Sequence, residues 1–69
     1  NRAAAAPLLL AQIDGAGAAR IVERSTGGKV LSVDRQEKKG RIMYRVKVLL
    51  PEGRVRTVMV DAETGRMGG

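Results

Sequence analysis

Carboxylates are the side chains of this chain best suited to acid–base or metal chemistry, because its 69 residues include no cysteine and no histidine. A zinc site, a thiol nucleophile and an imidazole base all need residues that the chain lacks. Paired catalytic carboxylates would have to meet in a cleft, and most acids here fall at expected turns or helix faces. We therefore expect solvated acids, no catalytic residue and no enzyme activity. The acids are Asp14, Glu23, Asp34, Glu37, Glu52, Asp61 and Glu63.

Asp61 and Glu63 are close enough in sequence to resemble part of a calcium loop. Such loops need several oxygen donors at alternate positions, and two acids are too few. Asp61 is instead expected to accept hydrogen bonds from backbone amides one to three residues further on, as in an Asx-turn. Gly65 would then take the positive φ that reverses the chain. We expect no metal and no cofactor.

The net charge of +6, from 13 Lys and Arg against 7 Asp and Glu, favours acidic partners in general. Proteins that bind single-stranded nucleic acid usually stack bases on aromatic side chains, and Tyr44 is the only aromatic residue, at a position expected to be buried. The expected helix has no basic stripe, because Glu23 separates Arg20 from Arg24. Nucleic acid is therefore not the expected partner.

A chain of this length forms one domain at most and buries only roughly 60% of the surface that its unfolded form exposes. Self-association, as in a homodimer, or an external partner is the remaining source of extra stability, since disulfides are excluded. Residues 1–12 read NRAAAAPLLLAQ, and their leucines are too few to span a bilayer. Small residues are typical of export cleavage sites, so this segment is either a linker close to an export signal or an unrelated leader. We expect a flexible leader at 1–12, a domain at 13–67 and a tail at 68–69.

One helix is expected to begin after Asp14, whose side chain would accept from an orphan amide of the first turn. Residues 26–28, Thr-Gly-Gly, would end it, because glycine tolerates the left-handed conformation. Residues 29–36 then form a strand, with Leu31 and Val33 expected toward the core, and a turn follows at 37–40. The helix has one apolar stripe at helical spacing, made of Ala18, Ile21, Val22 and Ser25.

Residues 42–60 predict a hairpin of known register. Pro51, Glu52 and Gly53 follow the order that a type I turn with a bulge requires, with glycine at the left-handed position. This turn sets Val46 opposite Val58, and a slip of one residue would exchange the faces of one strand. The face expected under the helix carries Ile42, Tyr44, Val46, Val48, Leu50, Val58 and Val60.

The other face of the hairpin is half apolar and half basic. It is either a solvated side whose aliphatic groups are covered by Arg and Lys stems, or a docking surface for another protein or for a second copy of the chain. The candidate docking residues are Met43, Arg45, Lys47, Leu49, Val55, Thr57 and Met59.

The order and spacing of four short pieces resemble the PepSY domain family. The pieces are GGKVLSV at 27–33, YRVKV at 44–48, PEG at 51–53 and VDAETG at 60–65, and the resemblance covers roughly residues 13–66. Family members commonly continue with aliphatic residues after the last glycine. This chain continues with Arg-Met-Gly-Gly instead, so no further strand is expected.

The resemblance implies a small exported module. PepSY modules occur in propeptides of thermolysin-type secreted proteases, in membrane-associated bacterial proteins and as small exported proteins, and they have been suggested to inhibit or modulate peptidases near the cell envelope. No catalytic residue belongs to the family motif. Its characteristic positions, which here are Gly28, Tyr44, Gly53, Asp61 and Gly65, are explained as turn and core determinants.

We therefore expect an α+β domain in which one N-terminal helix packs on a three-stranded antiparallel sheet, an αβββ meander. Its expected place is periplasmic or secreted in a bacterium. Its expected function is non-enzymatic binding of a protein, such as a protease or an envelope sensor, through a sheet edge or the mixed face. The alternatives are a self-associating structural module and a basic surface that binds anionic lipid or nucleic acid.

Overall fold

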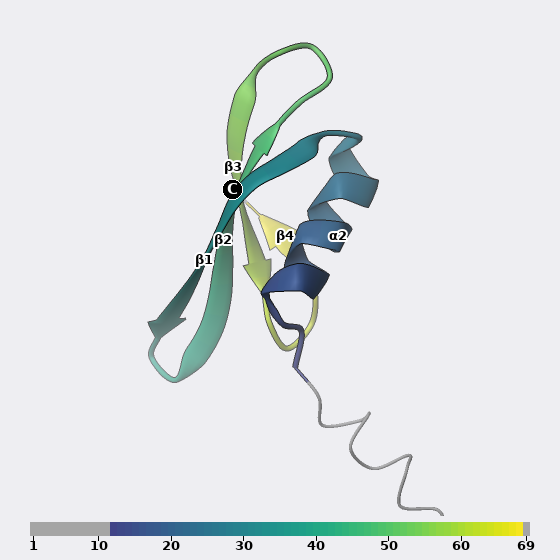
Figure 1. The fold of residues 1–69 in the computed structure, drawn as a ribbon. Helices are drawn as coiled ribbons and strands as arrows, with labels where there is room; N and C mark the ends of the chain where they lie inside the picture. Colours follow the sequence, from purple (N-terminus) through teal and green to yellow (C-terminus); the bar gives the residue numbers. More distant parts are fainter. Residues whose placement is uncertain (1–11, 69) are drawn as a thin grey trace, which may run out of the picture.

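The computed structural model describes residues 12–68, in which one helix packs against one face of a four-stranded antiparallel sheet (Figure 1). Neighbouring strands in the sequence are neighbours in the sheet, so its order is β1-β2-β3-β4. The α+β class is confirmed. The leader expected at 1–12 lies outside the described residues except for Gln12. The elements are α2 (Gly15–Thr26), β1 (Lys29–Lys38), β2 (Arg41–Leu49), β3 (Val55–Asp61) and β4 (Met67–Gly68).

The ends of α2 are those that the sequence predicts. The Asp14 Oδ1 accepts a hydrogen bond of 2.7 Å from the Gly17 N–H, and Gly27 ends the helix at a φ of 72°. Ala18 and Val22 are buried, but Ser25 is exposed, which corrects its place in the expected apolar stripe. The buried side of the helix continues instead at Thr26, which is half-buried, because side chains four residues apart lie on the same side of a helix.

A bulge in β1 decides which of its residues face the helix. The pairing with β2 shifts register between Val30 and Ser32, so that Leu31 is an extra residue. A bulge sets two residues of one strand opposite one residue of its partner. Val30 and Val33 therefore both pack against the core, although they are three residues apart. Leu31 is 50% exposed, and its expected place in the core is wrong because that expectation assumed unbroken alternation.

The turn between β1 and β2 is tighter than expected. β1 continues through Lys38, which pairs with Arg41, so only Lys39 and Gly40 form the loop. Both have positive φ, at 52° and 78°, as a two-residue type I′ turn requires. The strand is therefore two residues longer than the stretch from 29 to 36 that its sequence predicts.

The hairpin of β2 and β3 has the predicted register. Val46 pairs with Val58, and the other pairs follow from it. Gly53 has a φ of 96°, and its N–H donates a hydrogen bond of 2.9 Å to the Leu50 carbonyl. The turn and the constant register of its strands are confirmed.

A fourth strand corrects the expected three-stranded sheet. Met67 and Gly68 form β4, in which they pair with Val60 and Met59 of β3. A strand of two residues is too short to show alternation, and it exists only because the preceding turn returns the chain to β3. Its aliphatic content is one methionine, so composition gives no signal of it.

The core lies between α2 and the sheet and is built from small and β-branched side chains. Residues at its margin include Ile42 and Leu50, which were expected in the core. Valine dominates because β-branched side chains pack well on a pleated surface. The buried apolar residues are Ala18, Val22, Tyr44, Val46, Val48, Val58, Val60 and Ala62.

Gly28 allows the link from α2 to β1 to pass close to β2. A Cβ at this position would lie 2.5 Å from the Leu49 carbonyl oxygen and 2.8 Å from a methyl group of Val48. The first contact is with backbone, which cannot turn aside as a side chain can. A hydrogen is therefore the only side chain that this approach admits without a shift of the strand.

Gly28→Ala should lower the free energy of unfolding by about 1–3 kcal/mol, because the added methyl group forces the backbone of β2 to move. Gly68→Ala is the matched control, since its Cβ would meet nothing within 4 Å. It should change the free energy by less than about 0.5 kcal/mol. Denaturant unfolding followed by circular dichroism measures both, and equal effects would contradict the role of close approach.

Candidate protein-docking face of the sheet

One face of the sheet is covered by α2, and no other described element covers the opposite face (Figure 1). We call this opposite surface the open face. The register places all seven candidate docking residues on it, because they occupy alternate positions of β2 and β3 and pair with one another. In paired order they are Arg45 with Met59, Lys47 with Thr57 and Leu49 with Val55, while Met43 pairs with Asp61.

The exposure of these residues differs along the open face. Arg45 and Lys47 are exposed in its middle, and Val55 is 56% exposed at one end. The three other apolar residues and Thr57 are half-buried. Apolar surface therefore lies at both ends of the face, with two cations between.

β1 adds polar residues to the open face that were not among the expected site residues. Their signal in the sequence is polar character at alternate positions after Leu31. The expected place of Val33 in the core already implies this facing, but the candidate site was drawn from the β2–β3 hairpin alone. They are Ser32, Asp34 and Gln36, which pair with Lys47, Arg45 and Met43 respectively. Before the bulge, the exposed Lys29 pairs with Leu49 on the same face.

Two shallow hollows mark the open face. The first has a volume of about 300 Å³ and is lined by Ser32, Asp34, Arg45, Lys47 and Thr57. The second has a volume of about 690 Å³ and extends toward the end of β1. It is lined by Gln36, Glu37, Lys38, Arg45, Thr57 and Met59. Arg45 and Thr57 line both hollows, so the middle of the face is hollow and polar.

The two central cations have no ion-pair partner among residues 12–68. Arg41 pairs with Asp61, and Arg54 pairs with Glu52. Asp34 is opposite Arg45 in the register but lies beyond the 4.0 Å that defines an ion pair. Within the described chain, the charges of Arg45 and Lys47 are therefore available to a partner.

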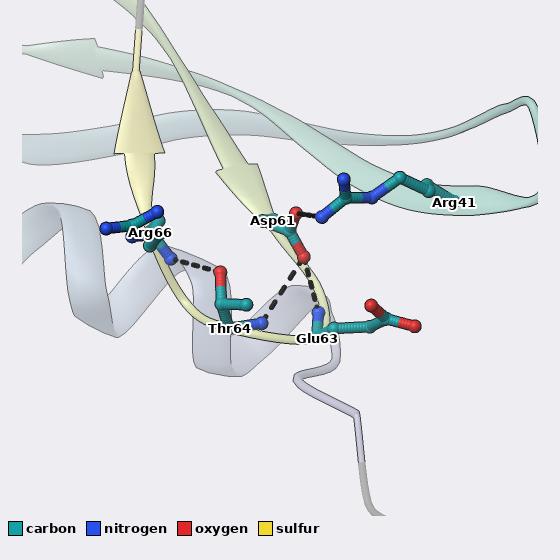
Figure 2. Close-up of polar contacts among 5 residues, drawn as sticks. All are labelled: Arg41, Asp61, Glu63, Thr64 and Arg66. Atoms are coloured by element: carbon teal, nitrogen blue, oxygen red, sulfur yellow. Dashed lines mark hydrogen bonds and ion pairs between the residues drawn. The ribbon is translucent and has the colours of Figure 1, made fainter.

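Asp61 lies at the end of β3, beside the open face, and holds the turn that follows (Figure 2). Its Oδ1 accepts hydrogen bonds from the Glu63 N–H at 2.8 Å and the Thr64 N–H at 3.3 Å. Its other oxygen pairs with Arg41. The Glu63 amide, with help from Thr64 and Arg41, lowers the pKa of Asp61 below its ordinary value of 3.8, although burial opposes this. The expected Asx-turn is confirmed.

The same turn joins three parts of the fold. Gly65 has a φ of 77°, and its N–H donates to the Asp61 carbonyl at 2.8 Å. The Ala62 N–H donates to the Ile42 carbonyl of β2 at 3.0 Å, and the Ala62 carbonyl accepts from the Ile13 N–H before α2 at 2.7 Å. Asp61 is thus engaged by the protein itself. Residues 12–68 contain no group of three side chains suited to hold a metal.

The chain is similar to the "Uncharacterized membrane protein YkoI" of Bacillus subtilis (strain 168), with 38% identity over 47 residues. The aligned part is 68% of this chain but 21% of that protein, so the chain spans about a fifth of the relative's length. No family model and no solved structure matches the chain. In the part of the chain that the structure describes, no helix has the length and apolar character needed to cross a membrane.

Acid should destabilise the wild type partly through Asp61. Because its pKa is lower in the folded than in the unfolded chain, its charge stabilises the fold above the unfolded pKa. That stabilisation is lost as the pH falls below the unfolded value and through the lowered folded pKa. Asp61→Asn keeps an acceptor for the turn but not the charge. It should melt below the wild type at pH 7 and lose less stability on acidification.

Thermal melts at a series of pH values measure this difference. Asp61→Ala, which removes both the charge and the acceptor, should be the least stable of the three proteins at pH 7. If wild type and Asp61→Asn lost equal stability between pH 7 and pH 2, another group would be responsible for the acid effect.

Proposed function

We propose that this chain is a non-enzymatic module that docks on another protein through the open face. The observation that carries this proposal is a sheet face on which apolar side chains flank two unpaired cations, with no described element over it. Apolar surface that no part of the chain covers is a feature of interaction sites, and here it lies on either side of the two cations. A solvent-exposed sheet face is usually polar, whereas four of the seven residues on this face are methionine, leucine or valine.

The roles of the acids support a module without catalysis. Asp14 caps α2, and Asp61 holds the turn after β3. Glu23 accepts a hydrogen bond of 3.2 Å from the Val30 N–H, which ties the helix to β1. These carboxylates have structural partners, and they come from separate parts of the fold instead of meeting in one cleft.

We further propose that the module is a PepSY-type domain of a bacterial cell envelope, periplasmic or secreted. The four pieces that carry the resemblance correspond to the end of α2 with the start of β1, the middle of β2, the β2–β3 turn and the turn after β3. The Bacillus subtilis relative is named as a membrane protein, which supports a location near the membrane. A peptidase or an envelope sensor is the proposed partner.

A double charge reversal on the open face tests the docking. Arg45→Glu with Lys47→Glu should reduce recovery of partner proteins from an envelope extract by about tenfold or more, because it turns attraction into repulsion. Arg20→Glu with Arg24→Glu is the matched control. It changes the net charge equally on exposed positions of α2 and should leave recovery unchanged.

Two results would contradict docking through this face. Equal recovery by the open-face variant and the wild type would mean that the partner binds elsewhere. Equal loss in both double variants would mean that only the overall positive charge matters.

Self-association through β1 is a second candidate function. β1 has ten residues and pairs with β2 on one side, while no described strand pairs with its other side. Such an edge can pair with another chain. The bulge at Leu31 and the charged residues that follow it oppose this pairing, because bulges and charges are common protections of sheet edges.

Sedimentation over a wide concentration range decides between these functions. A strict monomer at all concentrations would eliminate self-association and leave the docking proposal standing. A dimer that grows with concentration and disappears when Arg35 is replaced by proline would favour self-association. Arg35 pairs with Tyr44, whose own backbone bonds are made to β3, so the Arg35 N–H faces the free edge and proline removes that donor.

A further inference from the structure

We propose that the open face binds an extended acidic segment of a partner protein, in which alternate residues are apolar, acidic, acidic and apolar. The two acidic side chains would lie over Arg45 and Lys47. This inference rests on the proposed docking function, because it concerns the partner of the same face.

The order of side chains along β2 gives the pattern. Met43, Arg45, Lys47 and Leu49 occupy alternate positions of one strand and share the open face. Side chains two residues apart on a strand are separated by about 6.6–6.8 Å. An extended segment aligned with β2 has the same repeat, so its alternate side chains would meet these four residues in turn. The pattern reads the same in both directions, so it fits a parallel or an antiparallel segment.

β3 reinforces the apolar ends of this pattern. Val55 pairs with Leu49 at one end. At the other end the direct partner of Met43 is Asp61, whose carboxylate is already engaged by Arg41 and the turn amides. Met59, which pairs with Arg45, is the diagonal neighbour of Met43, within reach of long side chains. Each apolar residue of the segment would therefore contact side chains from two strands.

The hollow of about 300 Å³ in the middle of the face has the chemistry to hold carboxylates. Ser32 and Thr57 are on either side of Lys47, each about one strand spacing of 4.8 Å away. Cationic N–H groups bind carboxylate oxygens strongly, and hydroxyl groups add donors. Asp34 also lines the hollow and would repel a carboxylate, so the acidic side chains are expected toward β3.

Other occupants fit these observations less well. A second copy stacked on this face would bring Arg45 and Lys47 against like charges, which is costly at an interface. Nucleic acid would find no aromatic side chain to stack on, since Tyr44 lies on the helix side and is 8% exposed. A lipid surface needs protruding apolar groups, and Val55 is the only exposed apolar residue among the seven.

Peptides of designed order test the inference by NMR titration of the isotope-labelled protein. The probe TVTETETVT, blocked at both ends, has the proposed order. TVTQTQTVT removes its charge, and TETVTVTET keeps its composition but exchanges the acidic and apolar places. The first should shift amide signals of β2 and β3 and bind about fivefold or more tightly than the other two, as expected of two exposed ion pairs.

Protein variants test the same contacts, because one variant should weaken peptide binding and another should strengthen it. Arg45→Gln with Lys47→Gln should reduce affinity for the first peptide by about fivefold, whereas Asp34→Asn should increase it by about twofold, because a like charge is removed. Arg20→Gln with Arg24→Gln, on α2, should leave the affinity unchanged. Added salt should weaken binding, since exposed charges are screened.

The results separate this inference from the proposed function. Equal affinity for the two acidic peptides would overturn the proposed order and leave only charge attraction. If no peptide bound, but the partner in the extract still required Arg45 and Lys47, the acidic segment would be wrong and docking would stand. If neither peptide binding nor recovery of the partner depended on Arg45 and Lys47, both the inference and the proposed function would be wrong. Tighter binding of phosphatidylglycerol vesicles or of single-stranded DNA at the same residues would overturn the inference in favour of that ligand.

Discussion

The pairing of β2 with β3 is the constraint on which both surfaces of the sheet depend. The turn that contains Gly53 sets Val46 opposite Val58, and the alternation of strands then assigns every other residue to a face. A slip of one residue would turn Arg45 and Lys47 toward α2, where burial of unpaired charge is costly. The core and the open face are therefore two consequences of one register, and neither can change without the other.

Features set by local chemistry could be predicted from the sequence. Asp14 at the start of α2, Gly53 in the hairpin and Asp61 in its turn each bond to backbone a few residues away, so a short stretch specifies them. The bulge at Leu31 is different. The apolar residues from Val30 to Val33 show no local preference for a facing, and the choice is made by the need of two valines to reach the same core.

The candidate site shows the same division. Its seven expected residues belong to one hairpin, and the turn of that hairpin fixes which residues of the two strands share a face. Their common face could therefore be predicted from the sequence. Ser32 and Asp34 alternate with Val33, so its place in the core implies that they lie on the open face. The polar hollow depends in addition on which residues of β1 lie opposite Lys47 and Arg45, and that pairing is set by the bulge. β4 was missed for a related reason, since Met67 and Gly68 form a strand only when β3 is already in place.

Under the proposed docking function, Arg45 and Lys47 would keep a half-apolar sheet face from being covered by a second copy of this small domain. Apolar residues alone would invite another copy to cover them, whereas cations in the middle of the face oppose stacking of like on like. The same two charges favour a partner with carboxylates at matching positions. In this proposal a single pair of side chains would both attract one class of segment and repel the chain's own copies, and such a difference in affinity between partners is what specificity requires.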